Sequence, residues 1–308
     1  MSLRLRLLNC GLRWLARPRL ARISDPVAVR RDLDRMAPIF FPVPRSVQCT
    51  DVGLPGPHGA IPALWIEAGQ TDRRFAVLYL HGGGYIAGAP RHYLAMLGLL
   101  SRLSGLRFLV PAYRLAPEAP FPAALEDARA AWNALLAMGY GPKQIALGGD
   151  SAGGGLCLAL LAQLCGERQA PGFAFAFSPW TDLTGSGASV QSNARRDPVL
   201  PAQRFEELAT HYLAGHDAAD PRASPLFADF PAAPPIYLQV SDTEILRDDT
   251  DRLALRLQAA GAVVQVDRWP DAPHGWQLFA GRLPEAREAL RRTAAQLRTA
   301  FAGLALRL

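Results

Sequence analysis

Short apolar runs alternate with longer helical segments along most of this chain, an order that few folds accommodate. The runs expected to be strands cover residues 75–80, 107–113, 144–149, 173–178, 236–241 and 263–269. The segments with helical periodicity cover 91–104, 122–138, 152–166, 245–260 and the chain from 284 onward. Because strands that are apolar throughout are buried on both faces, this alternation predicts an α/β fold with a mostly parallel sheet covered by helices.

Two stretches stand outside the alternation. Residues 47–53 and 61–67 alternate between polar and apolar positions, which predicts an antiparallel hairpin ahead of the parallel strands. Between Trp180 and about Pro234 the chain is rich in Gly, Ser, Pro, Asn and Asp, with one good helical stretch at 201–214. Ligands of open α/β sheets bind at the carboxyl ends of the strands, so an insertion there is expected to form a lid.

The domain hypothesis follows from this insertion. Residues 46–184 and 232–308 would form the main domain, and residues 1–45 and 185–231 a small helical cap. Within the cap, Leu5, Leu8, Leu12 and Leu15 share one helical face, which describes an amphipathic helix. We expect that face to pack on the body of the protein, with attachment to an anionic membrane surface as the alternative.

The excess of positive charge also lies in this N-terminal segment. The net charge is +6, and six arginines precede Asp25, the first acidic residue: Arg4, Arg6, Arg13, Arg17, Arg19 and Arg22. No zinc-finger spacing, RNA-binding aromatic motif or basic stripe occurs elsewhere, which argues against a nucleic-acid partner. No run of about 18 apolar residues occurs, so no membrane-spanning helix is expected.

The location is inferred from the cysteines and the N-terminus. The four cysteines are scattered and form no disulfide framework, which is typical of core thiols in a reducing compartment: Cys10, Cys49, Cys157 and Cys165. The first 22 residues also lack the continuous apolar region of a secretory signal. We therefore expect a cytoplasmic protein.

A glycine-flanked serine marks the first candidate for chemistry. Gly149, Asp150, Ser151, Ala152 and Gly153 stand between an apolar strand and an apolar helix. Gly-x-Ser-x-Gly in that setting predicts a sharp strand-to-helix turn that exposes a nucleophilic serine, because side chains two positions away would collide. A structural turn with a solvent-facing serine is the alternative.

The sequence His81-Gly82-Gly83-Gly84 follows an earlier buried strand. A phosphate-binding loop would need a following Lys-Ser/Thr pair, which is absent. The motif instead predicts a loop whose backbone amides stabilise an oxyanion, and we assign that role to the amides of Gly83, Gly84 and Ala152. We expect His81 itself to brace the loop.

A serine nucleophile of this kind needs an acid and then a histidine further along the chain. His274 follows the last predicted strand, whereas His58, His92, His211 and His216 lie elsewhere. Asp242 and Glu244 both follow the strand at 236–241 and are candidates for the acid, while Asp248 and Asp249 fall within the next helix. Local chemistry does not separate Asp242 from Glu244.

Taken together, these motifs resemble those of the hormone-sensitive lipase family of bacterial esterases and lipases. The resemblance rests on "HGGG" at 81–84, "YRLAPEAPFPAALED" at 113–127, "GDSAGG" at 149–154, "SPWTDL" at 178–183, "DPVL" at 197–200 and "PHGW" at 273–276. It implies an α/β-hydrolase fold with a mostly parallel eight-stranded sheet and a helical cap. It also implies a serine carboxylesterase that acts on short- to medium-chain esters without a cofactor or metal.

The resemblance also selects the acid. Where the family usually reads Asp-Pro-Leu-Arg-Asp, this chain reads "EILRD" at 244–248, which places Glu244 at the acid position. The expected catalytic set is therefore Ser151, Glu244 and His274, with a small-molecule ester as substrate. A deacetylase, lactonase or amidase using the same residues is the alternative, and a non-catalytic receptor is disfavoured because His274 is present. Family members often pair, so a homodimer is a further expectation.

Overall fold

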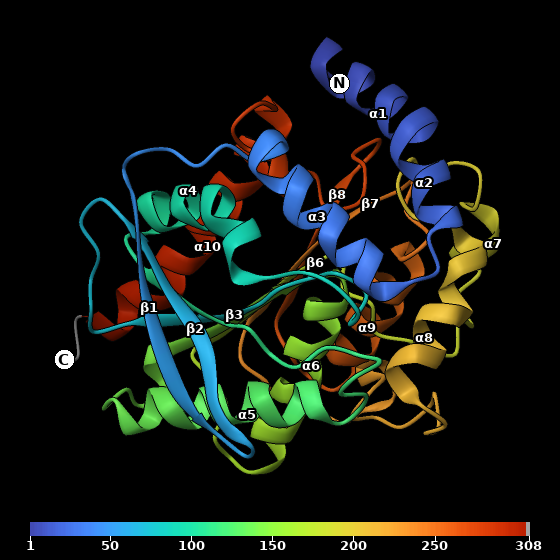
Figure 1. Cartoon of the computed structure of the whole chain (residues 1–308). Helices are drawn as coiled ribbons and strands as arrows, with labels where there is room; N and C mark the ends of the chain where they lie inside the picture. Colours follow the sequence, from blue (N-terminus) through green and yellow to red (C-terminus); the bar gives the residue numbers. More distant parts are fainter. Residues whose placement is uncertain (306–308) are drawn as a thin grey trace.

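The computed structural model describes residues 1–305 and contains one eight-stranded sheet (Figure 1). Its order is β1-β2-β4-β3-β5-β6-β7-β8, in which β1 pairs antiparallel with β2, β2 antiparallel with β4, and all other neighbours are parallel. The strands are β1 (Val47–Gly56), β2 (Gly59–Ala68), β3 (Ala76–Leu80), β4 (Arg107–Pro111), β5 (Ile145–Asp150), β6 (Phe173–Phe177), β7 (Ile236–Ser241) and β8 (Val264–Trp269). The predicted α/β fold and eight-stranded sheet are confirmed.

Helices cover both faces of the sheet. They are α1 (Leu3–Gly11), α2 (Arg17–Arg22), α3 (Pro26–Phe40), α4 (Leu94–Ser104), α5 (Ala123–Ala137), α6 (Ser151–Gly166), α7 (Ser189–Ser192), α8 (Phe205–Leu213), α9 (Arg247–Ala259) and α10 (Pro284–Ala305). Figure 1 shows α4 and α10 together on one face and α5 and α6 on the other. Each face has its own apolar core, because strands such as β3 and β5 are buried along their whole length.

The predicted elements agree with the observed ones to within a few residues at most boundaries. The β7 strand matches its predicted range of 236–241, and α10 begins at the predicted residue 284. The predicted helix at 91–104 is divided, since Pro90–Tyr93 forms a 3-10 turn before α4 begins. The four-residue helix α7 was not predicted, because so short a segment carries no periodicity.

The N-terminal segment differs from its prediction at one position. Leu5 is buried, and Leu8 and Leu12 pack against the same core, as expected of the apolar face of an amphipathic helix. Leu15 is 76% exposed instead. A π-helical turn at Leu12–Ala16 separates α1 from α2, and its extra residue per turn rotates Leu15 away from the packed face.

Helices α3 and α8 both pack on the loop that follows β3. Ile86, Ala87 and Ala116 form a small apolar cluster with side chains from α3 and α8, among them Leu33 and Leu208. Segments nearly two hundred residues apart in sequence therefore meet over the glycine loop. No helix in the described part of the chain combines the length and apolar character needed to cross a bilayer.

The cysteines are all free thiols. Cys157 and Cys165 are buried in α6, as the prediction of core thiols requires. That prediction is wrong for Cys10 and Cys49, which are exposed on α1 and on the edge strand β1.

Candidate active site

Ser151 stands at the junction between β5 and α6, where the chain reverses sharply. Its backbone φ is 54°, a left-handed value that is strained for a residue with a side chain. A Cβ atom on Gly149 would collide with the carbonyl oxygen of Gly153, and one on Gly153 would collide with that of His81. The turn therefore requires glycine on both sides of the serine, and it lifts Ser151 above the carboxyl edge of the sheet.

Asp150, the residue before Ser151, binds the glycine loop to the elbow. Its buried carboxylate accepts hydrogen bonds from Tyr79 Oη (2.9 Å), Tyr93 Oη (3.0 Å) and the amide of Gly82 (2.9 Å). Burial raises the pKa of Asp150 to about 6, although the three donors act in the opposite direction. Because one carboxylate connects β3, the loop and β5, the loop is fixed relative to Ser151.

The glycine loop presents backbone amides beside the elbow. Gly83 and Gly84 have φ values of 128° and 62°, which favour glycine, and the carbonyl of Gly83 accepts from the amides of Ile86 and Ala87. Within residues 1–305, the amides of Gly83, Gly84 and Ala152 donate to no acceptor. Three uncommitted donors beside the Ser151 turn have the chemistry of an oxyanion hole.

His81 is held in place by Tyr113 at the start of the glycine loop. Its ring stacks on Tyr113 with a centroid distance of 4.3 Å, and its carbonyl oxygen accepts a hydrogen bond of 2.6 Å from Tyr113 Oη. Burial lowers the pKa of His81 to about 4, so the imidazole is neutral at ordinary pH. This arrangement fits the predicted bracing role.

Glu244 and His274 meet through a hydrogen bond of 2.7 Å between Oε2 and Nδ1. The other carboxylate oxygen of Glu244 accepts from Ser178 Oγ (2.7 Å) and from the amide of Ser241 (3.0 Å). The Glu244 side chain is fully buried, and that of His274 is 10% exposed. The carboxylate is therefore held in one orientation, and the imidazole reaches the surface at one edge.

The protonation of His274 is set by competing effects. Burial acts to lower its pKa, but the hydrogen bond and charge of Glu244, assisted by Asp197 and Asp150, more than offset burial and raise it. No hydrogen bond joins Ser151 to His274 among the described residues. Such catalytic bonds often tighten only when substrate is bound.

Asp242 lies apart from His274. Its carboxylate is 3.9 Å from Arg268, and its side chain is 43% exposed. The amide of Asp242 donates to the carbonyl of Trp269, which fixes the turn after β7 but directs the side chain to the surface. Of the two acids that the sequence left open, the structure brings only Glu244 to the histidine.

Three supporting residues escaped the reasoning from sequence. Ser178, at the end of β6, donates to Glu244. Asn193 Nδ2 donates to the carbonyl oxygens of Asp242 (3.0 Å) and Glu244 (2.8 Å), and Asp197 accepts from the amide of Ile245 (3.1 Å). Asn193 and Asp197 belong to the insertion, and no spacing connects them to the acid loop. The one sequence signal that could have identified two of them is that Ser178 and Asp197 are the first residues of the motifs "SPWTDL" and "DPVL".

Three large aromatic residues from the site motifs and the loops beside them, Tyr85, Trp180 and Trp276, occupy two different places. Tyr85 stacks on Tyr212 of α8 at 3.7 Å and lies 6.0 Å from Trp180, all three being buried above α6. Trp276 instead belongs to the core on the α4 and α10 face, where it packs 5.8 Å from Trp269. Only Tyr85 and Trp180 therefore flank the elbow together.

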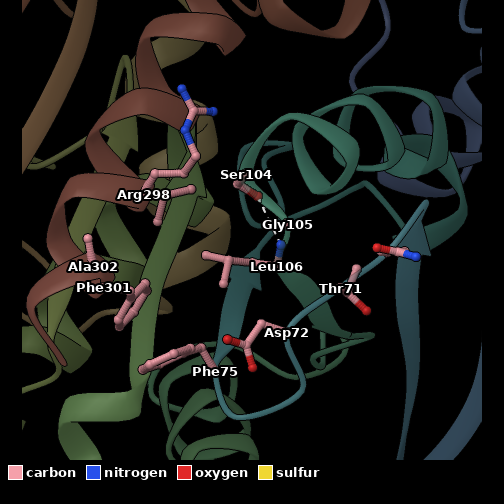
Figure 2. Close-up of a pocket in the computed structure, with 11 residues that line it drawn as sticks. Thr71, Asp72, Phe75, Ser104, Gly105, Leu106, Arg298, Phe301 and Ala302 are labelled. Atoms are coloured by element: carbon pink, nitrogen blue, oxygen red, sulfur yellow. Dashed lines mark hydrogen bonds between the residues drawn. The ribbon is translucent and has the colours of Figure 1, made fainter. Parts of the chain in front are cut away.

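A cavity of about 460 Å³ lies at the opposite edge of the sheet (Figure 2). Phe75, Leu106 and Arg298 are among its lining residues. Phe75 and Leu106 directly precede β3 and β4, so this cavity opens at the amino ends of the parallel strands. Ser151 follows a carboxyl end, and the cavity is therefore no part of the candidate active site.

Comparisons with known proteins agree with this geometry. Residues 77–278 match a family model described as an alpha/beta hydrolase fold. An acetyl-hydrolase of Streptomyces hygroscopicus is 39% identical over 79% of this chain and 81% of its own length. An ethyl acetate hydrolase of Pseudomonas putida is 33% identical over 70% of each chain. The crystal structure of an esterase from the bacterial hormone-sensitive lipase family superposes with a TM-score of 0.90 at 40% identity, covering 97% of this chain and 98% of the other.

Proposed function

Because this chain belongs to the bacterial hormone-sensitive lipase family of α/β-hydrolases and is a carboxylic ester hydrolase, we propose that Ser151, His274 and Glu244 carry its reaction. The observation that supports this assignment most strongly is the 2.7 Å hydrogen bond between Glu244 and His274, together with the strained left-handed backbone of Ser151. Neighbouring backbone amides without acceptors complete the set that acyl transfer needs.

The proposed reaction proceeds through an acyl-enzyme. Ser151 Oγ attacks the ester carbonyl while His274 takes its proton, and Glu244 holds the imidazole by its Nδ1–H. The amides of Gly83, Gly84 and Ala152 stabilise the tetrahedral oxyanion, each worth roughly 3 kcal/mol in the transition state. His274 then protonates the leaving alcohol. Water attacks the acyl-enzyme with the same histidine as base, and the acid product leaves Ser151 free.

We propose that residues 1–45 and 185–231 act as a cap over this site. Side chains of α3 and α8 pack on the loop that carries Gly83 and Gly84, and a Cβ atom on Gly84 would lie only 3.5 Å from Leu208 of α8. Apolar side chains therefore stand close to the position of the reacting carbonyl. The exposed free thiols of Cys10 and Cys49 favour a reducing compartment, in keeping with a cytoplasmic location.

The same crowding supports short acyl groups, acetyl foremost, as the preferred substrates. The buried Tyr85, Tyr212 and Trp180 pack against one another beside α6, and two relatives are named for acetyl or ethyl acetate hydrolysis. We expect kcat/KM for p-nitrophenyl esters to be highest at acetate or butyrate. It should fall at least tenfold by laurate, because even one methylene group that does not fit a pocket costs about tenfold or more in kcat/KM. A profile that peaks at laurate would contradict this substrate class.

A matched p-nitroanilide of the same acyl group tests the alternative activities. The ester should be hydrolysed far faster than the anilide, because His274 is the one group among the described residues that we assign to protonate a leaving group. An anilide rate equal to the ester rate would favour the amidase alternative.

The pH dependence follows from His274, which must be neutral to accept the serine proton. Its pKa is raised above the ordinary value of 6.5. As pH falls through that raised pKa the base becomes protonated, so kcat/KM should decline on an acid limb whose midpoint lies above 6.5. Initial rates with p-nitrophenyl acetate, corrected for buffer hydrolysis, measure it. A midpoint well below that value would show that Glu244 does not raise the pKa of the imidazole.

A further inference from the structure

Helix α1 is attached to the body through one of its faces. Leu5 is buried, and Leu8 and Leu12 pack against the α4 and α10 core. Polar contacts reinforce this attachment, because Ser2 donates to the carboxylate of Glu285 and Asn9 Nδ2 donates to the carbonyl of Asp271. The opposite face is therefore the one that this helix presents outward, and Figure 1 shows α1 at the outer edge of the molecule.

That outward face is apolar as well. Leu3 is 70% exposed, Leu7 64% and Trp14 72%. Leu3 and Leu7 lie one turn apart on α1, the exposed Cys10 follows on the next turn, and Trp14 lies one turn further on, in the π-helical turn Leu12–Ala16 that continues the helix. A helix that covers a protein core normally turns polar residues to solvent. A row of large apolar side chains on the exposed face is unusual and marks a contact surface.

Positive charge borders this row, and the acidic side chain that contacts the start of α1 is that of Glu285. The first acidic residue is Asp25, and Arg6 forms no ion pair among the described residues. Arg13 and Arg17 donate to backbone carbonyls at residues 194–196, which orient the guanidinium groups but leave their charge uncompensated. The exposed face of α1 is thus an apolar row beside three arginines, Arg6, Arg13 and Arg17, that form no ion pair among the described residues.

A second apolar row continues the surface at the end of α3. Met36, Ile39 and Phe40 are exposed at helical spacing on α3, and Val43 is exposed just after the helix ends. Arg282 connects the two rows, because its carbonyl accepts from Arg4 and its guanidinium donates to the carbonyl of Ile39. The start of α1 and the end of α3 therefore meet at the same loop.

We propose that the outer face of α1 docks on the surface of an anionic phospholipid bilayer. Leu3, Leu7 and Trp14 enter the headgroup region, and the arginines contact lipid phosphates. A second copy of this chain is a poorer occupant, because two such faces would bring together arginines that form no ion pair within one chain, Arg6, Arg13 and Arg17 among the described residues. Asn9 contacts Asp271, three residues before His274, so docking holds the base loop near the lipid.

Flotation with vesicles tests this proposal. We expect the full-length protein to float with vesicles made of equal parts phosphatidylglycerol and phosphatidylcholine, and not with phosphatidylcholine alone. The double variant L7E/W14E should bind at least about tenfold more weakly, because both side chains lose apolar burial. Raising NaCl to about 0.5 M should also weaken binding, since salt screens the arginines. Binding should not change between pH 6 and 9, because arginine does not titrate there.

The matched control is L255E, which replaces a leucine that is 66% exposed on α9, outside this surface. It should float as the unmodified protein does. Arg6→Glu, at a side chain with no partner among the described residues, should weaken binding to anionic vesicles about fivefold or more. Circular dichroism confirms that each variant is folded. The proposal fails if the unmodified protein does not float, if L7E/W14E floats equally well, or if sedimentation shows that L7E/W14E only converts a dimer to a monomer.

Discussion

Ser151→Ala is expected to lose ester hydrolysis almost completely, by about 10⁵-fold or more in kcat, while the protein folds normally. Without Oγ no acyl-enzyme forms, and only the oxyanion donors and substrate binding remain to accelerate attack by water. The change removes one partly exposed oxygen at a backbone position that alanine adopts no less easily than serine. The free energy of unfolding should therefore change by no more than about 0.5 kcal/mol. Initial rates with p-nitrophenyl acetate and a thermal melt measure the two effects.

The control for this result is a double variant. When residues act as a unit, the losses in kcat caused by replacing each of them do not add. The double variant S151A/H274A should therefore be no slower than S151A alone. Turnover near that of the unmodified enzyme in folded S151A would remove Ser151 from the mechanism.

Glu244→Gln is expected to lower kcat by about 10³-fold or more. The amide has no negative charge to stabilise the imidazolium, and its NH₂ group can hold the histidine in the wrong tautomer. Asp242→Asn is the matched change on the neighbouring acid, whose side chain is 43% exposed and faces Arg268. It should leave kcat within about twofold, as surface substitutions usually do.

The pH dependence of kcat/KM shows whether Glu244→Gln acts through the charge and position of His274 or through a folding defect. Because Glu244 raises the pKa of His274, its replacement by glutamine should move the acid limb to lower pH as well as reduce the maximum. A crippled Asp242→Asn beside an active Glu244→Gln would reverse the assignment of the acid.

Much of this architecture could be predicted from local sequence. Apolar runs such as 236–241 have one stable environment, a strand covered on both faces, so the sheet could be read from the chain. The elbow could also be predicted, because a Cβ atom at Gly149 or Gly153 would collide with backbone. In both cases the constraint is contained within a few consecutive residues.

The rest depended on contacts between distant segments. Asp242 and Glu244 carry the same group two residues apart, and only the path of the loop decides which one reaches His274. Asn193 supports that loop from about fifty residues away, with no periodicity to show it. The π-helical turn that exposes Leu15 follows from packing and not from a local pattern.

The outer face of α1 is a further case. Its sequence predicted one apolar face, because Leu5, Leu8 and Leu12 lie together, and the prediction stopped there. Only the observed burial showed that Leu7 and Trp14 remain exposed on the other side. A pattern can identify an amphipathic helix, but the structure is needed to see what its second face meets.

The most direct test of the account is to find the acylated residue. Reaction with a fluorophosphonate, followed by digestion and mass spectrometry, should place one adduct on the peptide that contains Ser151. His274→Ala should label much more slowly, because the serine then lacks its base. An adduct on any other residue, or unchanged labelling in Ser151→Ala, would contradict the proposal that this hydroxyl is the nucleophile.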